Sequence, residues 1–271
     1  MPAALTREKV VRAALRLLDK VGLDGLTLRK LAAELSVQAP ALYWHFKNKQ
    51  ELLDEMATCV LTEAIEEMLP GQRGHWPDWA MHLGNGIRRM LLRHRDGAKM
   101  FSGTYLTNSE LYLPIEAALR RLVEGGFTVR DAICAYRTIY CYAVGFTIEE
   151  QAVYPRPGKR DPRYDLRRRA ARMIPAEEFP LTLAAGEEMF DFDQQFQQGL
   201  QLIVRGLRPH RPAGRRDADT AHSRHNTTEP NSTFAGFSKQ TKKSFPFVQP
   251  VLGLPGGNSG RMREHRPRRS E

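Results

Sequence analysis

The sequence predicts an all-α protein, and three observations support this prediction. Apolar residues recur at helical spacing through most of residues 1–207, beginning with TREKVVRAALRLLDKVG. The same residues contain no convincing alternation of apolar and polar side chains, as a half-buried strand would show. Glycines, prolines and N-capping residues divide the periodic segments into typical helix lengths. We expect three parts, residues 1–50, 51–207 and 208–271.

The sequence of the first part, residues 1–50, predicts a compact unit of three helices. Thr6 suits the N-cap of the first helix and Gly22 its end. Thr27 suits the N-cap of the second, and the third begins near Gln38, with Pro40 tolerated in its first turn. Helices of about nine and seven residues are marginal alone. The second and third must therefore pack against the first, with a tight turn between them.

A long helix is expected to join this unit to the second part. Asn48 and Glu51 have the spacing of a capping box, and amphipathic residues follow until Pro70-Gly71. Further helices are expected at about 76–94, 96–103, 113–124, 129–154 and 190–207. The second part is thus a larger helical body.

The positive charge of the chain is concentrated at its two ends. The formal net charge is +10, and residues 208–271 hold 13 Lys and Arg against 5 Asp and Glu. This tail is rich in Pro, Gly, Ser and Thr without periodicity, so we expect it to be disordered. Residues 1–50 hold 9 basic against 4 acidic side chains, as a phosphate-binding surface would.

Several classes of protein are not expected. The chain has no run of 18 apolar residues and no apolar core of a signal peptide, so we expect a cytoplasmic protein. Cys59, Cys134 and Cys141 form no disulfide or metal-ligand pattern and are expected to be small buried side chains. The histidines lie in different elements outside any catalytic motif. We therefore expect no enzyme, no metal site and no cofactor.

The stretch SVQAPALYWHFKNKQELLDEM, residues 36–56, has the organisation of a helix-turn-helix DNA-binding unit. In such units the third helix enters the major groove and flanking side chains bind phosphates. Leu42 and Phe46, four residues apart, are expected to point inward, and Trp44 partly so. The positions expected to meet DNA are Gln38, Ala39, Pro40, Ala41, Tyr43, His45, Lys47 and Lys49.

The segment GLTLRKLAAELSVQAPALYWHFKNKQELL resembles the N-terminal signature of the TetR family of transcriptional regulators. The chain is also similar to the tetracycline repressor subgroup in LLRHRDGAK at residues 91–99, GGF at 125–127 and GFTIEEQ at 145–151. The resemblance covers about residues 5–207. It implies a homodimeric, ligand-responsive repressor that binds a palindromic operator and is released by an effector.

This resemblance also implies the DNA contacts. The matching positions are Thr27, which caps the second helix, together with Arg29, Ala39, Pro40, Ala41, Tyr43, His45 and Lys49. The subgroup has Gln and Thr where this chain has Ala39 and Ala41, so we expect a different operator. The family commonly has Gly where this chain has Ser36, so we expect a positive φ there.

The family dimerises through a four-helix bundle, which the resemblance places on helices 129–154 and 190–207. The second of these helices carries one apolar stripe, which we assign to the dimer interface. The alternative is an ordinary core helix. The residues of the stripe are Phe192, Phe196, Leu200, Ile203 and Leu207.

The resemblance further implies an effector pocket in the body. Tetracycline repressors use two His and one Asn for the drug and its Mg²⁺, and this chain has Phe101, Ile65 and Leu83 at those positions. Only Glu149 retains a carboxylate, so we expect an apolar effector without a metal. The expected walls are Ile65, Leu83, Ile87, Met90, Met100, Phe101, Thr104, Tyr105, Tyr136, Tyr140 and Glu149.

Two alternatives remain open at this point. The hydrophobic residues of the expected pocket could simply fill a core that binds no small molecule. The basic tail could make the protein a nucleic-acid binder that is indifferent to sequence, with binding that falls with salt on any DNA.

Overall fold

The computed structural model describes residues 5–68, 74–164, 175, 177–187 and 191–209. Their regular secondary structure is helical, apart from one isolated β-bridge between Arg156 and Lys159, which confirms the all-α prediction. The expected helix end at Pro70-Gly71 and the expected disorder of residues 210–271 lie outside the described residues. No helix in the described ranges has the length and apolarity needed to span a membrane.

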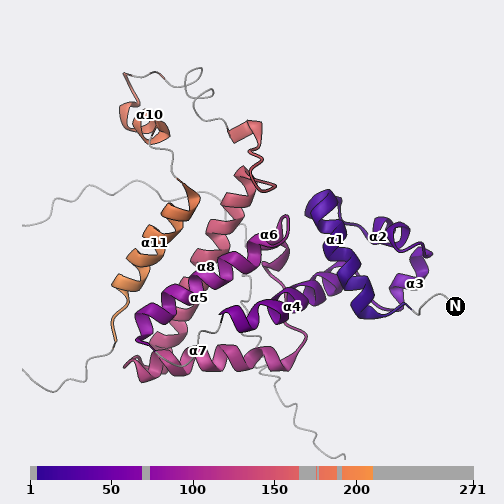
Figure 1. The fold of residues 1–271 in the computed structure, drawn as a ribbon, viewed down its shortest axis with the longest axis horizontal. Helices are drawn as coiled ribbons and strands as arrows, with labels where there is room; N and C mark the ends of the chain where they lie inside the picture. The colour runs from indigo at the N-terminus through magenta and orange to yellow at the C-terminus, as the bar shows by residue number, and fades with distance from the viewer. Residues whose placement is uncertain (1–4, 69–73, 165–174, 176, 188–190, 210–271) are drawn as a thin grey trace, which may run out of the picture.

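The helices form a small head and a larger body (Figure 1). The head consists of α1 (Arg7–Gly25), α2 (Leu28–Glu34) and α3 (Ala39–Tyr43). The long helix α4 (Lys49–Met68) runs from the head into the body, where it packs against α5 (Trp76–Leu92) and α6 (Gly97–Phe101). The body continues with η1 (Ser109–Leu111), α7 (Tyr112–Glu124), α8 (Val129–Val153), η2 (Pro162–Tyr164), α10 (Pro180–Glu187) and α11 (Phe192–Gly206).

The local signals in the head act as the sequence predicts. The Thr6 and Thr27 hydroxyls accept hydrogen bonds from the third residue of α1 and α2, each at 3.2 Å. Gly22 interrupts α1 with a φ of +75°, and the chain resumes helical geometry to Gly25. Ser36 has a φ of +55°, so the tight turn between α2 and α3 forms without glycine.

A capping arrangement also starts α4. The Asn48 side chain accepts from the Glu51 N–H at 2.9 Å, as the capping box predicts. The Glu51 carboxylate in turn accepts the N–H of Lys47 at 2.8 Å, one residue before the expected donor. The start of α4 is therefore fixed from both directions.

In the body, α8 packs along α5, and α11 covers both helices. Phe196 and Leu200 of α11 are fully buried within this single chain. The apolar stripe assigned to a dimer interface therefore faces the protomer's own core, and the assignment is wrong for these two residues. Phe192, Ile203 and Leu207 are half-buried at the edges of the same contact.

Other differences from the sequence-based expectations are small. Helix α5 ends at Leu92, because His94 to Asp96 form a loop in which Asp96 has a φ of +54°. The two 3₁₀ turns and α10 were not expected. Cys134 and Cys141 lie exposed on α8, and Cys59 is half-buried, so the expected burial of the cysteines is wrong.

Candidate DNA-binding surface and effector cavity

The end of α3 exposes two aromatic side chains. Tyr43 is 56% exposed and Trp44 is 89% exposed, whereas Leu42 and Phe46 are fully buried. The inward orientation expected in part for Trp44 is wrong. Trp44 lies two residues from both Leu42 and Phe46, about 200° around a helix, so it points away from the core that they fill.

The other predicted DNA contacts are exposed or half-buried in the head or at the start of α4. Those exposed are Thr27, Arg29, Gln38, Pro40 and Lys47, and those half-buried are Ala39, Ala41, His45 and Lys49. The Lys49 ammonium donates to the Leu23 carbonyl at 3.0 Å, which ties the start of α4 to the end of α1. Among these residues, Arg29, Gln38 and Lys47 therefore offer long polar side chains to solvent.

Arg7 holds the end of α3 against α4, a role that the sequence pattern did not reveal. Its guanidinium donates to the His45 carbonyl and to the carboxylates of Glu51, at 3.2 Å, and Glu55, at 2.8 Å. It also lies 4.5 Å from the centre of the Phe46 ring. These contacts orient the exposed aromatic residues relative to the long helix.

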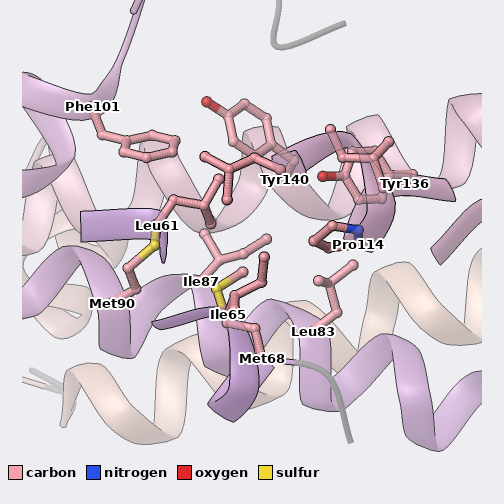
Figure 2. Close-up of a pocket in the computed structure, with 12 residues that line it drawn as sticks. Leu61, Ile65, Met68, Leu83, Ile87, Met90, Phe101, Pro114, Tyr136 and Tyr140 are labelled. Atoms are coloured by element: carbon pink, nitrogen blue, oxygen red, sulfur yellow. The ribbon is translucent and has the colours of Figure 1, made fainter. Parts of the chain in front are cut away.

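A small apolar cavity of about 40 Å³ lies in the body, between α4, α5, α6, η1, α7 and α8 (Figure 2). The rings of Phe101, Tyr136 and Tyr140 lie along one side, opposite aliphatic and methionine side chains of α4 and α5. Its lining residues are Leu61, Ile65, Met68, Leu83, Ile87, Met90, Phe101, Leu111, Pro114, Ile115, Tyr136 and Tyr140.

This lining brings together Ile65, Leu83, Ile87, Met90, Phe101, Tyr136 and Tyr140 from the sequence-based set. It excludes four other predicted residues. Met100 and Thr104 are buried elsewhere, and the Thr104 hydroxyl donates to the Phe101 carbonyl at 2.6 Å. Tyr105 is 54% exposed. Glu149 is exposed because it lies two and a half helical turns beyond Tyr140, on the opposite side of α8.

The polar groups of the cavity are two tyrosine hydroxyls. Burial raises the pKa of Tyr136 to about 12. Burial also raises the pKa of Tyr140, with smaller contributions from Tyr136 and Cys141. Both tyrosines are therefore neutral at physiological pH. Within the described part of the chain, neither hydroxyl has a hydrogen-bond partner.

The head is joined to the body by a second contact besides α4. The Asp96 carboxylate accepts the Leu23 N–H of α1 at 2.9 Å. Asp19 of α1 accepts from the Arg95 N–H at 3.0 Å and lies 3.0 Å from the His94 ring. The loop between α5 and α6 thus holds the end of α1.

Gln151 of α8 fixes this loop from the body side. Its side-chain amide donates to the carbonyls of Leu91, at 3.2 Å, and His94, at 2.8 Å, and accepts from the Ala98 N–H at 3.0 Å. The side chain is 95% buried, and each of its polar atoms is used. Hydrogen bonds therefore run from α8 through the loop to α1.

Beside Gln151, a buried ion pair connects three body helices. Arg88 of α5 forms two bonds of 2.7 Å to Glu150 of α8 and one of 2.6 Å to Asp193 of α11. The Arg88 and Glu150 side chains are 9% and 12% exposed. The guanidinium also lies 5.0 Å from the centre of the Phe196 ring. This cluster fixes α11 on the other two helices.

An exposed helix-turn-helix head, joined by one long helix to an all-α body with an apolar cavity, defines a DNA-binding regulator. The chain matches the family model for bacterial regulatory proteins of the tetR family over residues 10–56. It matches the tetracyclin repressor-like C-terminal domain over residues 69–211. The chain therefore belongs to the TetR family.

Individual relatives agree with this assignment. The class A tetracycline repressor from transposon 1721 of Escherichia coli is 40% identical over 74% of this chain and 90% of its own length. A possible TetR family regulator from Streptomyces coelicolor superposes with a TM-score of 0.66 at 35% identity, covering 74% of this chain and 98% of that one. The Streptomyces coelicolor protein ActR, solved with actinorhodin, gives 0.63 at 29% identity, covering 76% and 97%.

Membership of this family settles the broad function. The protein is a ligand-responsive, DNA-binding transcriptional repressor and not an enzyme. Proteins of the family bind DNA operators and small-molecule effectors and act as dimers.

Proposed function

We propose that this repressor is a homodimer that reads a palindromic operator with α3 and releases it when a small apolar effector enters the cavity without a metal. The observation that supports this most directly is the course of α4. One end of α4 starts beside the exposed aromatic pair Tyr43 and Trp44, and its other end lines the cavity. A change in the cavity therefore acts on a helix that carries the head. In this proposal the head is residues 1–50 and the body residues 51–207.

Operator reading is assigned to the exposed side chains around α3. Arg29 can form a bidentate contact with guanine, and Gln38 can pair with adenine. Tyr43 and Lys47 suit phosphates, and Pro40 presents an apolar contact. Ala39 and Ala41 supply no hydrogen-bonding group, so the operator differs from that of the tetracycline repressors.

The apolar effector is inferred from what lines the cavity. The three positions aligned with the drug-binding polar residues of tetracycline repressors are Ile65, Leu83 and Phe101, and each lies in the apolar lining. A polar, metal-bound drug would lose its water there without gaining partners. The ActR complex with actinorhodin supports the idea that this fold accepts other ligand classes.

The partner subunit is expected to cover α8 and the outer side of α11. Leu202 is 70% exposed on that side of α11, although the apolar stripe of the same helix packs inward. The remaining candidates from the stripe are the half-buried Phe192, Ile203 and Leu207.

The operator can be recovered by selecting bound duplexes from random DNA with the full chain. We expect two inverted half-sites about one helical turn apart, and a complex whose mass contains two chains. Recovery of unrelated sequences, with binding that falls with salt equally on any duplex, would instead support a binder driven by the basic tail.

The effector class is tested separately by calorimetry with tetracycline and Mg²⁺. We expect no binding at micromolar concentrations, because the cavity lacks the polar residues that such a ligand needs. Micromolar binding that depends on Mg²⁺ would contradict the apolar, metal-free effector and leave the operator prediction unaffected.

A further inference from the structure

The side chains that line the cavity in the body are of few chemical kinds, which restricts the class of ligand that it can bind. Twelve residues line it, and none of them carries a charge or an amide (Figure 2). Nine of these side chains are aliphatic, methionine or proline, and three are aromatic. The hydrogen-bonding groups of its side chains are the hydroxyls of Tyr136 and Tyr140.

The absence of charge in this lining selects against charged ligands. A carboxylate or an ammonium group in the cavity would lose its hydration without an ionic partner, which is strongly unfavourable. The buried guanidinium of Arg88 lies outside this lining and is already bonded to Glu150 and Asp193. The structure therefore favours a neutral ligand.

The two tyrosines select against a pure hydrocarbon. Tyr136 and Tyr140 are four residues apart on α8, so their side chains lie on the same face of the helix. Neither hydroxyl has a partner among the described residues, and a ligand that displaced water from them without an oxygen would leave them unpaired. A site that offers hydrogen bonds discriminates strongly against analogues that cannot accept them.

The shape of the lining favours ring compounds. Phe101, Tyr136 and Tyr140 present ring surfaces along one side, and the polarizable side chains of Met68 and Met90 lie opposite. Aromatic rings stack on such surfaces, and methionine adapts to them.

From these observations we infer that the effector is a neutral ring compound carrying at least one carbonyl or hydroxyl oxygen, which hydrogen-bonds to Tyr136 or Tyr140. The inference rests on the proposed function, because it assumes that this cavity is the effector site. It adds the polar requirement and the two residues that determine specificity.

Binding also requires the cavity to open. Its volume of about 40 Å³ holds little more than a water molecule, whereas ligand pockets enclose roughly 300 Å³ or more. Leu61, Ile65 and Met68 place α4 along one side of the cavity. A ring compound must displace part of the lining, and a displacement of the α4 wall would move the helix that carries the head.

Three probes that share one tricyclic ring system can test the inference. They are 9-fluorenone, which has a neutral carbonyl, fluorene, which has no oxygen, and fluorene-9-carboxylate, which is an anion. Their dissociation constants are measured by calorimetry on the full chain and on the single and double variants Tyr136→Phe and Tyr140→Phe. Tyr105→Phe is the matched control, because this tyrosine is exposed and lies outside the cavity lining.

We expect 9-fluorenone to bind about tenfold more tightly than fluorene, and the carboxylate to bind most weakly. The preference for the ketone should disappear in the double Tyr→Phe variant and persist in Tyr105→Phe. Equal binding of ketone and hydrocarbon, a preference that survives the double substitution, tightest binding of the carboxylate, or no binding by any probe would each overturn the inference.

Operator binding measured on the same samples shows whether the ligand inference or the proposed function has failed. If fluorene binds as tightly as the ketone and releases the operator, the apolar effector site stands and the role assigned to the tyrosines falls. If the protein binds no specific operator before any probe is added, the proposed function itself fails.

Discussion

At the scale of single residues, Arg88 forms with Glu150 the least exposed ion pair among the described residues. Arg88→Met would leave the Glu150 carboxylate without its partner while it is only 12% exposed. Removing one member of a buried ion pair costs about 3–5 kcal/mol. We expect a loss of unfolding free energy of that order in urea denaturation.

Arg120→Met provides the matched control for this substitution. Arg120 pairs with Glu116 on the surface of α7, where the two side chains are 67% and 64% exposed. Exposed pairs contribute about 0–1 kcal/mol, so this variant should unfold almost as the parent does. Equal effects of the two substitutions would contradict the importance of burial at Arg88.

Glu51 should make stability depend on pH. The Lys47 N–H and the Arg7 guanidinium lower the pKa of the Glu51 carboxyl. A group whose pKa is lower in the folded state stabilises the fold above its unfolded pKa, and this contribution is lost as pH falls through the folded value. Glu51→Gln should therefore lower the melting temperature at pH 7, and the difference should shrink below about pH 4. A difference that does not change with pH would exclude the charge as its cause.

Single residues also show which side-chain orientations the sequence pattern predicts correctly. The i, i+4 spacing of Leu42 and Phe46 correctly predicts which side chains are buried. The partly inward orientation expected of Trp44 is wrong, because its position two residues from Leu42 and Phe46 turns it away from the core. The bracing role of Arg7 depends on contacts with residues 38 to 48 positions away, which local spacing does not reveal.

At the scale of elements, the packing of α11 on α8 depends on close approach at Gly199. A Cβ atom on Gly199 would lie 2.1 Å from the Tyr142 hydroxyl oxygen, whereas one on Gly206 would meet nothing within 4 Å. Gly199→Ala should therefore cost about 1–3 kcal/mol of unfolding free energy. Gly206→Ala should leave stability unchanged or raise it by up to about 1 kcal/mol.

A second substitution tests whether the stability loss comes from this clash or would follow from any change to α11. Adding Tyr142→Phe removes the hydroxyl, and it should recover part of the stability lost in Gly199→Ala. Equal stability of the two glycine variants, with no recovery on the Tyr142→Phe background, would show that the contact between α8 and α11 is looser than described.

The sequence predicts the limits and packing of some helices better than those of others. Helices α1 to α4 have caps and turns that signal their limits, and the structure places these limits within a few residues of the prediction. Helix α10 was missed because PLTLAAGE is mostly apolar and has no amphipathic period. The stripe on α11 is apolar as predicted, but Phe196 and Leu200 within it pack into the protomer's own core, since periodicity identifies an apolar face and not what covers it.

At the scale of the whole molecule, the loop between α5 and α6 should control the orientation of the head. Asp96→Gly tolerates the positive φ of this position but removes the acceptor of the Leu23 N–H, whereas Asp96→Asn keeps both features. We expect faster hydrogen exchange at the end of α1 and weaker operator binding in Asp96→Gly alone. Similar behaviour of the two variants would mean that this contact does not position the head.

The site as a whole was predicted in part. Most of the cavity walls follow from the resemblance to the tetracycline repressor subgroup, and they come from segments far apart in the chain. Five lining residues were missed: Leu61, Met68, Leu111, Pro114 and Ile115. The last three lie on η1 and α7, which approach the cavity only in the folded body. The small volume of the cavity depends on how all these side chains pack together, and no local pattern determines it.

Reading of a specific operator by the α3 surface can be tested by one titration. Binding of the selected operator is measured by fluorescence anisotropy for the full chain, Tyr43→Ala and Tyr112→Ala. Tyr112 is also exposed but lies on α7 of the body, so it controls for loss of a surface tyrosine. We expect Tyr43→Ala to lose its preference for the operator over unrelated duplex and Tyr112→Ala to keep it. Equal preference in all three proteins would contradict the assignment of α3 as the reading element.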